Sequence, residues 1–287
     1  MIAVCSADLV HRGPRPPYLT SHARFAKRVG VGFLLLLPIA LALRTRWPRG
    51  RDWLAAAALG VMYFAFFIVL FNLAFRYTTA ARGSLALSTL PLMTMLVGAA
   101  FGVEALDSRK GVGVVIAMAG AAVALVSGLA DAPAGAWRGD LIMIAATLVM
   151  ALYNVWSRPF IVRSSPLAYV TAGMGFGSAC LVAVAAWSDG YASVASFHGP
   201  QWMAVVYLGV FGGAAAFFLW VFALERTTPT RTAITMTINP VFASAVGALT
   251  LGEPIGINLV VGLVAVFAGI WIATRESAGK KRANLPT

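Results

Sequence analysis

The sequence predicts an all-α integral membrane protein, and three observations indicate this fold class. Of the 287 residues, 60% are hydrophobic and only 11% are charged, whereas a soluble domain carries about 25% charged residues. The mean hydropathy is +0.83. Long charge-free stretches recur along the whole chain, without the polar faces that helices of soluble proteins show. This composition excludes a soluble enzyme, and the formal charge of +12 indicates basic loops beside a membrane, not nucleic-acid binding.

Nine charge-free intervals are candidates for membrane spans. A helix needs roughly 20 apolar residues to cross about 30 Å of hydrocarbon. The two shorter intervals, 29–43 and 141–157, can be extended by uncharged flanks or by snorkelling basic side chains. The intervals cover residues 29–43, 53–75, 83–103, 111–130, 141–157, 164–188, 199–224, 232–252 and 254–274. We expect each to form one spanning helix, although the first also resembles the apolar part of a signal peptide.

An internal repeat divides the chain. Shifting the sequence by 149 residues, the difference between Pro91 and Pro240, aligns the two halves without a gap. The same shift matches Trp53 with Trp202, Thr78–Thr79 with Thr227–Thr228, Arg82 with Arg231, Glu104 with Glu253, Gly113 with Gly262 and Gly120 with Gly269. We therefore expect two repeats, residues 1–130 and 131–287, joined by a segment rich in Gly, Ala and Pro.

The first repeat has one apolar run fewer than the second. By the same shift, the missing run would pair with residues 140–162, so residues 1–12 are expected to be the end of an incomplete first helix. Two explanations stay open: a start site placed too late, or a nine-helix variant. Five helices per repeat is an odd number, which predicts an inverted 5+5 arrangement of the two copies.

Basic residues predict the orientation. A ten-helix arrangement with both termini in the cytoplasm places 14 of the 22 Lys and Arg residues in cytoplasmic segments, as the positive-inside rule requires. Five basic residues before the first long interval fit this arrangement badly. We expect a multi-pass protein of the inner (plasma) membrane with a cytoplasmic C-terminus.

Two matching segments carry a family resemblance. They are "AFRYTTAARGSLALSTLPLMTMLVGAAFGVEAL" and "ALERTTPTRTAITMTINPVFASAVGALTLGEPI". Each has a small-residue-rich helix, a mid-helix proline and a glycine–glutamate end, which resembles the EamA-type exporters of the drug/metabolite transporter superfamily. The first repeat departs from the pattern because it lacks the opening of helix one and has Gly102-Val103-Glu104 in place of a direct Gly-Glu pair.

The resemblance implies a fold and a function. It implies ten helices around a central cavity, lined by helices one, three and four of each repeat. Similar exporters move amino acids or other small metabolites, and relatives carry nucleotide sugars or triose phosphates. We therefore expect alternating-access transport of a small-molecule substrate across the lipid bilayer.

The side chains within the predicted spans limit the classes of substrate that the protein can carry. No Asp, Glu, Lys, Arg or His lies within the nine intervals, whereas a phosphorylated substrate would need buried Arg or Lys. Arg82 and Arg231 lie near helix ends, and we interpret them as interfacial anchors. We therefore expect neutral or zwitterionic cargo such as amino acids. The alternatives are a transporter of sugar phosphates or nucleotide sugars, a non-transporting scaffold, and an intramembrane enzyme, which would need clustered carboxylates, histidines or metal ligands. We expect no catalysis, cofactor or metal.

Polar and aromatic side chains are the candidate substrate-binding groups. Amides and phenols bind ammonium and carboxylate groups, and an indole ring attracts cations. Tyr153 and Trp156, three residues apart, are expected to share a face that the adjacent Asn154 does not share; packing or an interfacial aromatic belt is the alternative for these side chains. The candidates are Tyr63, Phe67, Ser88, Tyr153, Asn154, Trp156, Trp220 and Thr237.

Prolines and glycines predict bending and close packing. Pro91 and Pro240 each remove a backbone hydrogen bond in mid-helix, so we expect them to act as hinges. Gly173-x-x-x-Gly177 and Gly209-x-x-x-Gly213 allow helices to cross closely. We interpret these motifs as packing within the chain, and they would also suit contacts in a homodimer.

Overall fold

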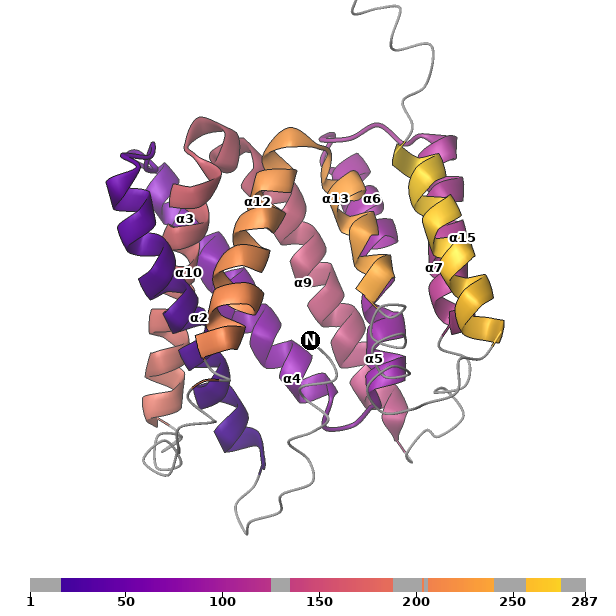
Figure 1. The fold of residues 1–287 in the computed structure, drawn as a ribbon, viewed down its shortest axis with the longest axis horizontal. Coiled ribbons are helices and arrows are strands. Elements are labelled where there is room, and N and C mark those ends of the chain that lie inside the picture. Colours follow the sequence, from indigo (N-terminus) through magenta and orange to yellow (C-terminus); the bar gives the residue numbers. More distant parts are fainter. Residues whose placement is uncertain (1–16, 125–134, 188–202, 204–205, 240–256, 275–287) are drawn as a thin grey trace, which may run out of the picture.

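The computed structural model describes residues 17–124, 135–187, 203, 206–239 and 257–274. All regular elements in these ranges are helical, as the sequence predicts. They are α2 (Pro17–Ala42), α3 (Asp52–Val61), η1 (Met62–Phe67), α4 (Ile68–Ala74), α5 (Ala80–Leu87), α6 (Leu90–Ala100), α7 (Ser108–Ala124), α9 (Ala136–Arg163), α10 (Pro166–Trp187), η2 (Leu208–Ala215), α12 (Ala216–Arg226), α13 (Pro229–Ile234), η3 (Thr235–Thr237) and α15 (Ile257–Thr274). Figure 1 shows these helices lying side by side in one bundle.

Long apolar helices confirm the predicted class of all-α membrane protein. Five described stretches are long and apolar enough to cross a membrane: Asp52–Ala74, Arg82–Ala100, Ala136–Arg163, Pro166–Val184 and Leu208–Arg226. Two shorter apolar helices cover Val29–Ala42 and Val260–Thr274. The predicted intervals 111–130, 164–188, 199–224, 232–252 and 254–274 are only partly within the described residues.

Helix α9 is the centre of the bundle. It contacts α4, α5, α6, η1 and α12, and Figure 1 shows it crossing the middle of the molecule. One side of α9 is buried, including Met143, Ala146 and Met150, whereas Leu141 and Leu148 on another side are exposed. Both sides are apolar, because a spanning helix meets lipid where a soluble helix would meet water.

Glycines let the helices around α9 approach closely. A Cβ atom added to Gly60 of α3 would lie 2.5 Å from Gly173 Cα of α10. One turn later on α10, a Cβ on Gly177 would overlap Phe64 Cβ of η1. The Gly173-x-x-x-Gly177 motif therefore packs against helices of the same chain.

Helices α7 and α15 form a second glycine-packed pair, at one side of the bundle in Figure 1. A Cβ on Gly113 would lie 2.6 Å from Gly269 O, and a Cβ on Gly120 would lie 2.8 Å from Gly262 O. The repeat matches Gly113 with Gly262 and Gly120 with Gly269, so each contact maps onto the other when the two helices are exchanged. Such reciprocity is typical of a two-fold relationship between two copies.

Local structure also recurs at the 149-residue spacing. Thr79 Oγ1 accepts the Arg82 backbone N–H at 3.4 Å, and Thr228 Oγ1 accepts the Arg231 N–H at the same distance. Threonine is a preferred residue at this position, because its hydroxyl binds a backbone N–H that the first turn leaves unpaired. The π-helical segments η1 and η2 also overlap under the shift.

We expect Gly113→Ala to destabilise the protein by about 1–3 kcal/mol, because the added methyl group must displace backbone of α15. Thermal unfolding in detergent measures this effect. Gly111→Ala is the matched control on the same helix, where the new Cβ would meet only Met95 Cε at 4.0 Å. Equal midpoints for the two variants would contradict the close packing of α7 on α15.

Candidate functional site

An aromatic cluster from three elements lies at the centre of the bundle. Tyr63 of η1 and Tyr153 of α9 are stacked, with ring centroids 4.3 Å apart and planes 15° apart. The ring centroid of Phe67 lies 5.4 Å from that of Tyr63. Phe217 of α12 packs edge-to-face against Tyr63, with ring centroids 5.7 Å apart. Tyr153 is 1% exposed, so its ring lies inside the protein and not in an interfacial belt.

An amide places hydrogen-bonding capacity beside these rings. Trp220 Nε1 of α12 donates to Asn154 Oδ1 at 3.0 Å, and Asn154 is completely buried. The adjacent residues Tyr153 and Asn154 therefore reach different neighbours, η1 and α12, and both stay inside. The cluster combines an apolar wall with an oriented amide and lacks a charged group of its own.

Several buried polar atoms on α9 and neighbouring helices have no hydrogen-bond partner among the described residues. They are Thr94 Oγ1, Tyr153 Oη, Asn154 Nδ2, Ser157 Oγ, Arg158 Nε, Tyr169 Oη, Thr230 Oγ1 and Arg231 Nε. An unpaired buried polar group costs about 1–3 kcal/mol, so each such group needs an explanation, such as a bound water or ligand. A small polar molecule beside α9 would satisfy some of them.

The π-helical segment η1 helps to build this centre. It interrupts an otherwise continuous helix from α3 to α4, and it carries Tyr63, Phe64 and Phe67, all buried. A π-helical turn holds an extra residue and therefore re-aims the side chains around it, which is why such turns occur frequently at functional sites. The sequence gives no signal for this feature.

The structure brings together five of the eight candidate residues. They are Tyr63, Phe67, Tyr153, Asn154 and Trp220. Trp156 lies apart: it is 37% exposed and packs edge-on against Phe101, with centroids 5.3 Å apart. Residues three apart in a helix point about 60° apart. Tyr153 therefore points into the protein, whereas Trp156 points toward its outer surface.

The two candidate hydroxyls bind their own helices. Ser88 Oγ donates to Ser84 O at 2.8 Å, and Thr237 Oγ1 donates to Ile234 O at 2.7 Å. Such bonds are common for helical Ser and Thr. Each hydroxyl keeps only its acceptor capacity for a ligand.

The candidate hinges lie in interrupted helices. The helix is broken between α5, which ends at Leu87, and α6, which begins at Leu90, and Pro91 lies in the first turn of α6. In the second repeat, α13 continues into the short 3₁₀ segment η3. Pro240 lies outside the described residues, and the hinge role of both prolines stays a prediction.

An ion pair that sequence reasoning missed links α5 to α9. Arg82 Nε donates to Asp140 Oδ2 at 3.1 Å, and Arg82 Nη2 also binds this oxygen. Thr78 Oγ1 donates to Asp140 Oδ1 at 2.6 Å. Arg82 lies in the first turn of α5, and its role as an interfacial anchor stays a prediction beside this link to α9. The partners are 58 residues apart in sequence, so no local spacing could reveal the pair.

Glu104 forms a different link at the opposite end of α5 and α6. Its Oε1 accepts the Thr230 backbone N–H at 2.9 Å, and its Oε2 accepts from Lys110 Nζ at 3.2 Å. Glu104 is only 8% exposed. This carboxylate therefore fastens the α6–α7 connection to the start of α13.

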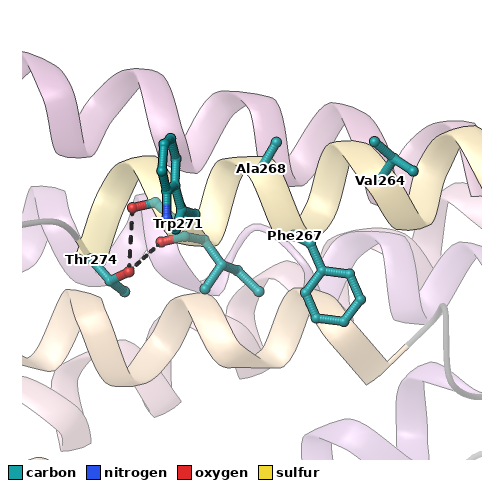
Figure 2. Close-up of a pocket in the computed structure, with 6 residues that line it drawn as sticks. Val264, Phe267, Ala268, Trp271 and Thr274 are labelled. Atoms are coloured by element: carbon teal, nitrogen blue, oxygen red, sulfur yellow. Dashed lines mark hydrogen bonds between the residues drawn. The ribbon is translucent and has the colours of Figure 1, made fainter.

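Two cavities lie outside the aromatic cluster. One, of about 590 Å³, runs along an outer face of α15 and is lined by Val264, Phe267, Ala268, Ile270, Trp271 and Thr274. Figure 2 shows that the Thr274 hydroxyl there is bonded within its own helix, to Ile270 O and Trp271 O. This apolar face suits lipid. The other cavity, of about 600 Å³, is lined partly by Arg82, Ser88 and Asp140.

Within the described residues, no group of three or more His, Cys, Asp or Glu side chains could hold a metal ion. The polar groups of the aromatic cluster are amide, phenol and indole groups. Such groups bind small polar molecules by hydrogen bonds and ring contacts.

Comparisons with known proteins agree with this architecture. Residues 18–126 and residues 137–275 each match the EamA-like transporter family. A solved structure matches with a TM-score of 0.71 at 21% identity. The matched region covers 95% of this chain and 91% of the chain in that structure. At this identity the likeness shows the fold alone.

Two curated proteins are similar over most of their length. The "Probable terminal-alkyne amino-acid exporter" of Streptantibioticus cattleyicolor is 28% identical over 258 residues, which cover 89% of this chain and 84% of that protein. An "Uncharacterized transporter" of Archaeoglobus fulgidus is 25% identical over 245 residues, which cover 85% of this chain and 84% of that protein.

We expect Trp220→Phe to lower the free energy of unfolding by about 1–3 kcal/mol, because it leaves the buried Asn154 Oδ1 without its donor. Unfolding midpoints in detergent measure this loss. Trp137→Phe is the control: Trp137 is 60% exposed, so its midpoint should stay close to that of the wild type. A Trp220→Phe midpoint equal to the control would argue against the bond.

Proposed function

The chain belongs to the EamA-like transporter family, and we propose that it exports small neutral or zwitterionic metabolites, with amino acids as the first candidates. It is a multi-pass membrane protein with a small-molecule substrate. Family membership does not give the substrate class, the binding site or the direction of transport, and these three are what we propose. One observation carries it: the buried centre of the bundle joins stacked aromatic rings to an oriented amide, with unpaired polar atoms beside them.

The chemistry of this centre fits an amino acid. The Asn154 amide donates and accepts hydrogen bonds, so it matches both the carboxylate and the ammonium group of a zwitterion. The Tyr63 and Tyr153 rings cover each other's faces in the stack, so a substrate that separates them gains apolar surface for its side chain and aromatic faces that attract a cation. The name of the Streptantibioticus relative, an amino-acid exporter, supports the same class.

Phosphorylated sugars fit less well. Their phosphate needs a cation to pair with it, and the rings and the amide of the aromatic cluster carry no charge. At Arg82 the neighbouring Asp140 carboxylate would repel a phosphate. The second class of alternative, an enzyme, lacks support because the relatives described above are named transporters.

We propose that residues 1–130 and 131–287 are two inverted repeats. The support comes from the reciprocal contacts of Gly113 with Gly269 and of Gly120 with Gly262, and from the threonine caps that recur 149 residues apart. In such an arrangement a site between the repeats opens alternately to each side of the membrane. The aromatic cluster fits this role because η1 comes from the first repeat and α9 and α12 from the second.

We further propose that the C-terminus is cytoplasmic. This orientation puts Glu104 and Lys110 on the cytoplasmic side and the Arg82–Asp140 pair on the outer side. Its support is the excess of basic residues in the expected cytoplasmic segments.

A homodimer remains a prediction, and Gly173 and Gly177 give it no support because they pack within the chain.

Counterflow in proteoliposomes tests the function. Vesicles that contain the purified chain and unlabelled amino acids are offered traces of labelled leucine, phenylalanine, threonine or a sugar phosphate. We expect at least one amino acid to accumulate above the level in protein-free vesicles, with no accumulation of the sugar phosphate. Accumulation of the sugar phosphate alone would replace the proposal by its alternative.

Asn154→Ala should lower the rate of amino-acid counterflow by about tenfold or more, since a buried hydrogen bond to a charged group is worth about 1.5–3 kcal/mol. Leu148→Ala is the control on the same helix, at an exposed position. Both variants are compared at equal amounts of folded protein. An unchanged rate for Asn154→Ala would remove the amide from the substrate site.

Pro91→Ala should slow the transport cycle more than it weakens substrate binding, because the new N–H allows α5 and α6 to join into one helix. Turnover and binding are measured separately, by counterflow at saturating substrate and by equilibrium binding. Turnover equal to that of the wild type would contradict the hinge.

A further inference from the structure

The cavity beside the Arg82–Asp140 pair has the features of a second binding site. Its volume is about 600 Å³, which lies within the range of about 300–1,000 Å³ for small-molecule sites. It lies where α5, α6, α7 and the start of α9 come together. Its lining residues are Arg82, Leu85, Ala86, Ser88, Thr89, Leu92, Val115, Met118, Ala119, Ala122 and Asp140.

The two charges in this wall are fixed in place but accessible. Thr78 Oγ1 holds Asp140 Oδ1 at 2.6 Å, so the carboxylate has a partner besides the guanidinium. The ion pair uses the donors at Nε and Nη2 of Arg82, and a guanidinium has five N–H donors in all. The side chains of Arg82 and Asp140 remain 29% and 22% exposed, so a ligand in the cavity can reach both.

The rest of the wall is mostly apolar. Leu85 and Leu92 come from the interrupted helix α5–α6, and Met118 comes from α7. Ser88 and Thr89 lie at the interruption, and their hydroxyls donate to Ser84 O and Ala86 O, which leaves oxygen lone pairs for a ligand. The cavity therefore presents one positive group, one negative group and an apolar floor.

We propose that this cavity binds a zwitterionic amino acid with an apolar side chain. The carboxylate pairs with Arg82, the ammonium group pairs with Asp140, and the side chain lies on Leu85, Leu92 and Met118. When a zwitterion binds, two ion pairs with the ligand replace the Arg82–Asp140 pair, so both protein charges stay compensated. A ligand with a lone carboxylate would place two negative charges around Arg82, and one with a lone ammonium group would place two positive charges around Asp140, so neither compensates both protein charges.

The site is separate from the aromatic cluster. Its ion pair lies near the starts of α5 and α9, whereas Tyr153 and Asn154 lie more than a dozen residues beyond Asp140 along α9. Its ligand class rests on the proposed function. In the proposed orientation this end faces outward, so the cavity would hold the substrate during its release.

The test measures the equilibrium binding of labelled leucine, phenylalanine and threonine to the full chain in phosphatidylglycerol nanodiscs, which contain no lipid ammonium group. We expect two sites per chain for at least one amino acid. Arg82→Gln and Met118→Trp should each remove one site, the second by filling the cavity while keeping the ion pair. Arg138→Gln, which removes a positive charge two residues from Asp140, is the matched control and should keep both sites.

Competition measures the chemistry of the site that Arg82→Gln removes. Leucine should displace the labelled amino acid from this site at a concentration about tenfold or more below that needed for 3-methylbutylamine or 4-methylpentanoate. The amine lacks the carboxylate of leucine, and the acid lacks its ammonium group. Equal competition by the three compounds would overturn the proposal, and so would two sites in both Arg82→Gln and Met118→Trp.

The two proposals fail in different ways. If Asn154→Ala removes a site while Arg82→Gln and Met118→Trp remove none, the central site stands and the second site is overturned. If Arg82→Gln and Met118→Trp remove a site and Asn154→Ala removes none, the second site stands and the central one fails. Binding of none of the three amino acids to the wild type overturns both.

Discussion

Close contact between helix backbones is the constraint on which this structure depends. In lipid, helices gain nothing by hiding apolar surface from water, so they associate through packing and hydrogen bonds. Gly60 on Gly173 and Gly113 on Gly269 bring backbones together where any larger side chain would collide. These contacts hold α3 against α10 and α7 against α15, and they leave α9 between the two groups. The aromatic and amide side chains of the site can meet only because this frame positions them.

Among the described residues, charged links lie at the two ends of the bundle and a neutral polar bond lies at its centre. At one end Arg82 binds Asp140; at the other, Glu104 binds Lys110 and the start of α13. Between them the Asn154–Trp220 bond lies among rings. An alternating-access protein needs contacts at each end that form and break in turn, and a centre that binds cargo from either side. The distribution of polar groups matches these needs, with charged links at the ends and neutral groups in the middle.

Much of the fold follows from the sequence because charge exclusion from hydrocarbon is a local property. The charge-free intervals 53–75, 141–157 and 164–188 each fall on an observed helix, and the matched glycines occur at helix contacts. Side-chain direction is harder to predict: an apolar helix shows no polarity difference between its lipid face and its interior, so Trp156 could not be separated from Tyr153. The Arg82–Asp140 pair joins distant segments, and only the packing of α5 on α9 reveals it.

Access to the centre from both sides of the membrane is the central claim of this account. It can be measured with a single cysteine at Ala151, a buried residue one turn before Asn154, after Cys5 and Cys180 are replaced by Ala. A membrane-impermeant thiol reagent is applied to oriented vesicles from either side, with and without the amino acid found by counterflow. We predict labelling from both sides and slower labelling when the amino acid is present. Labelling from one side alone, or from neither, would contradict alternating access through this site.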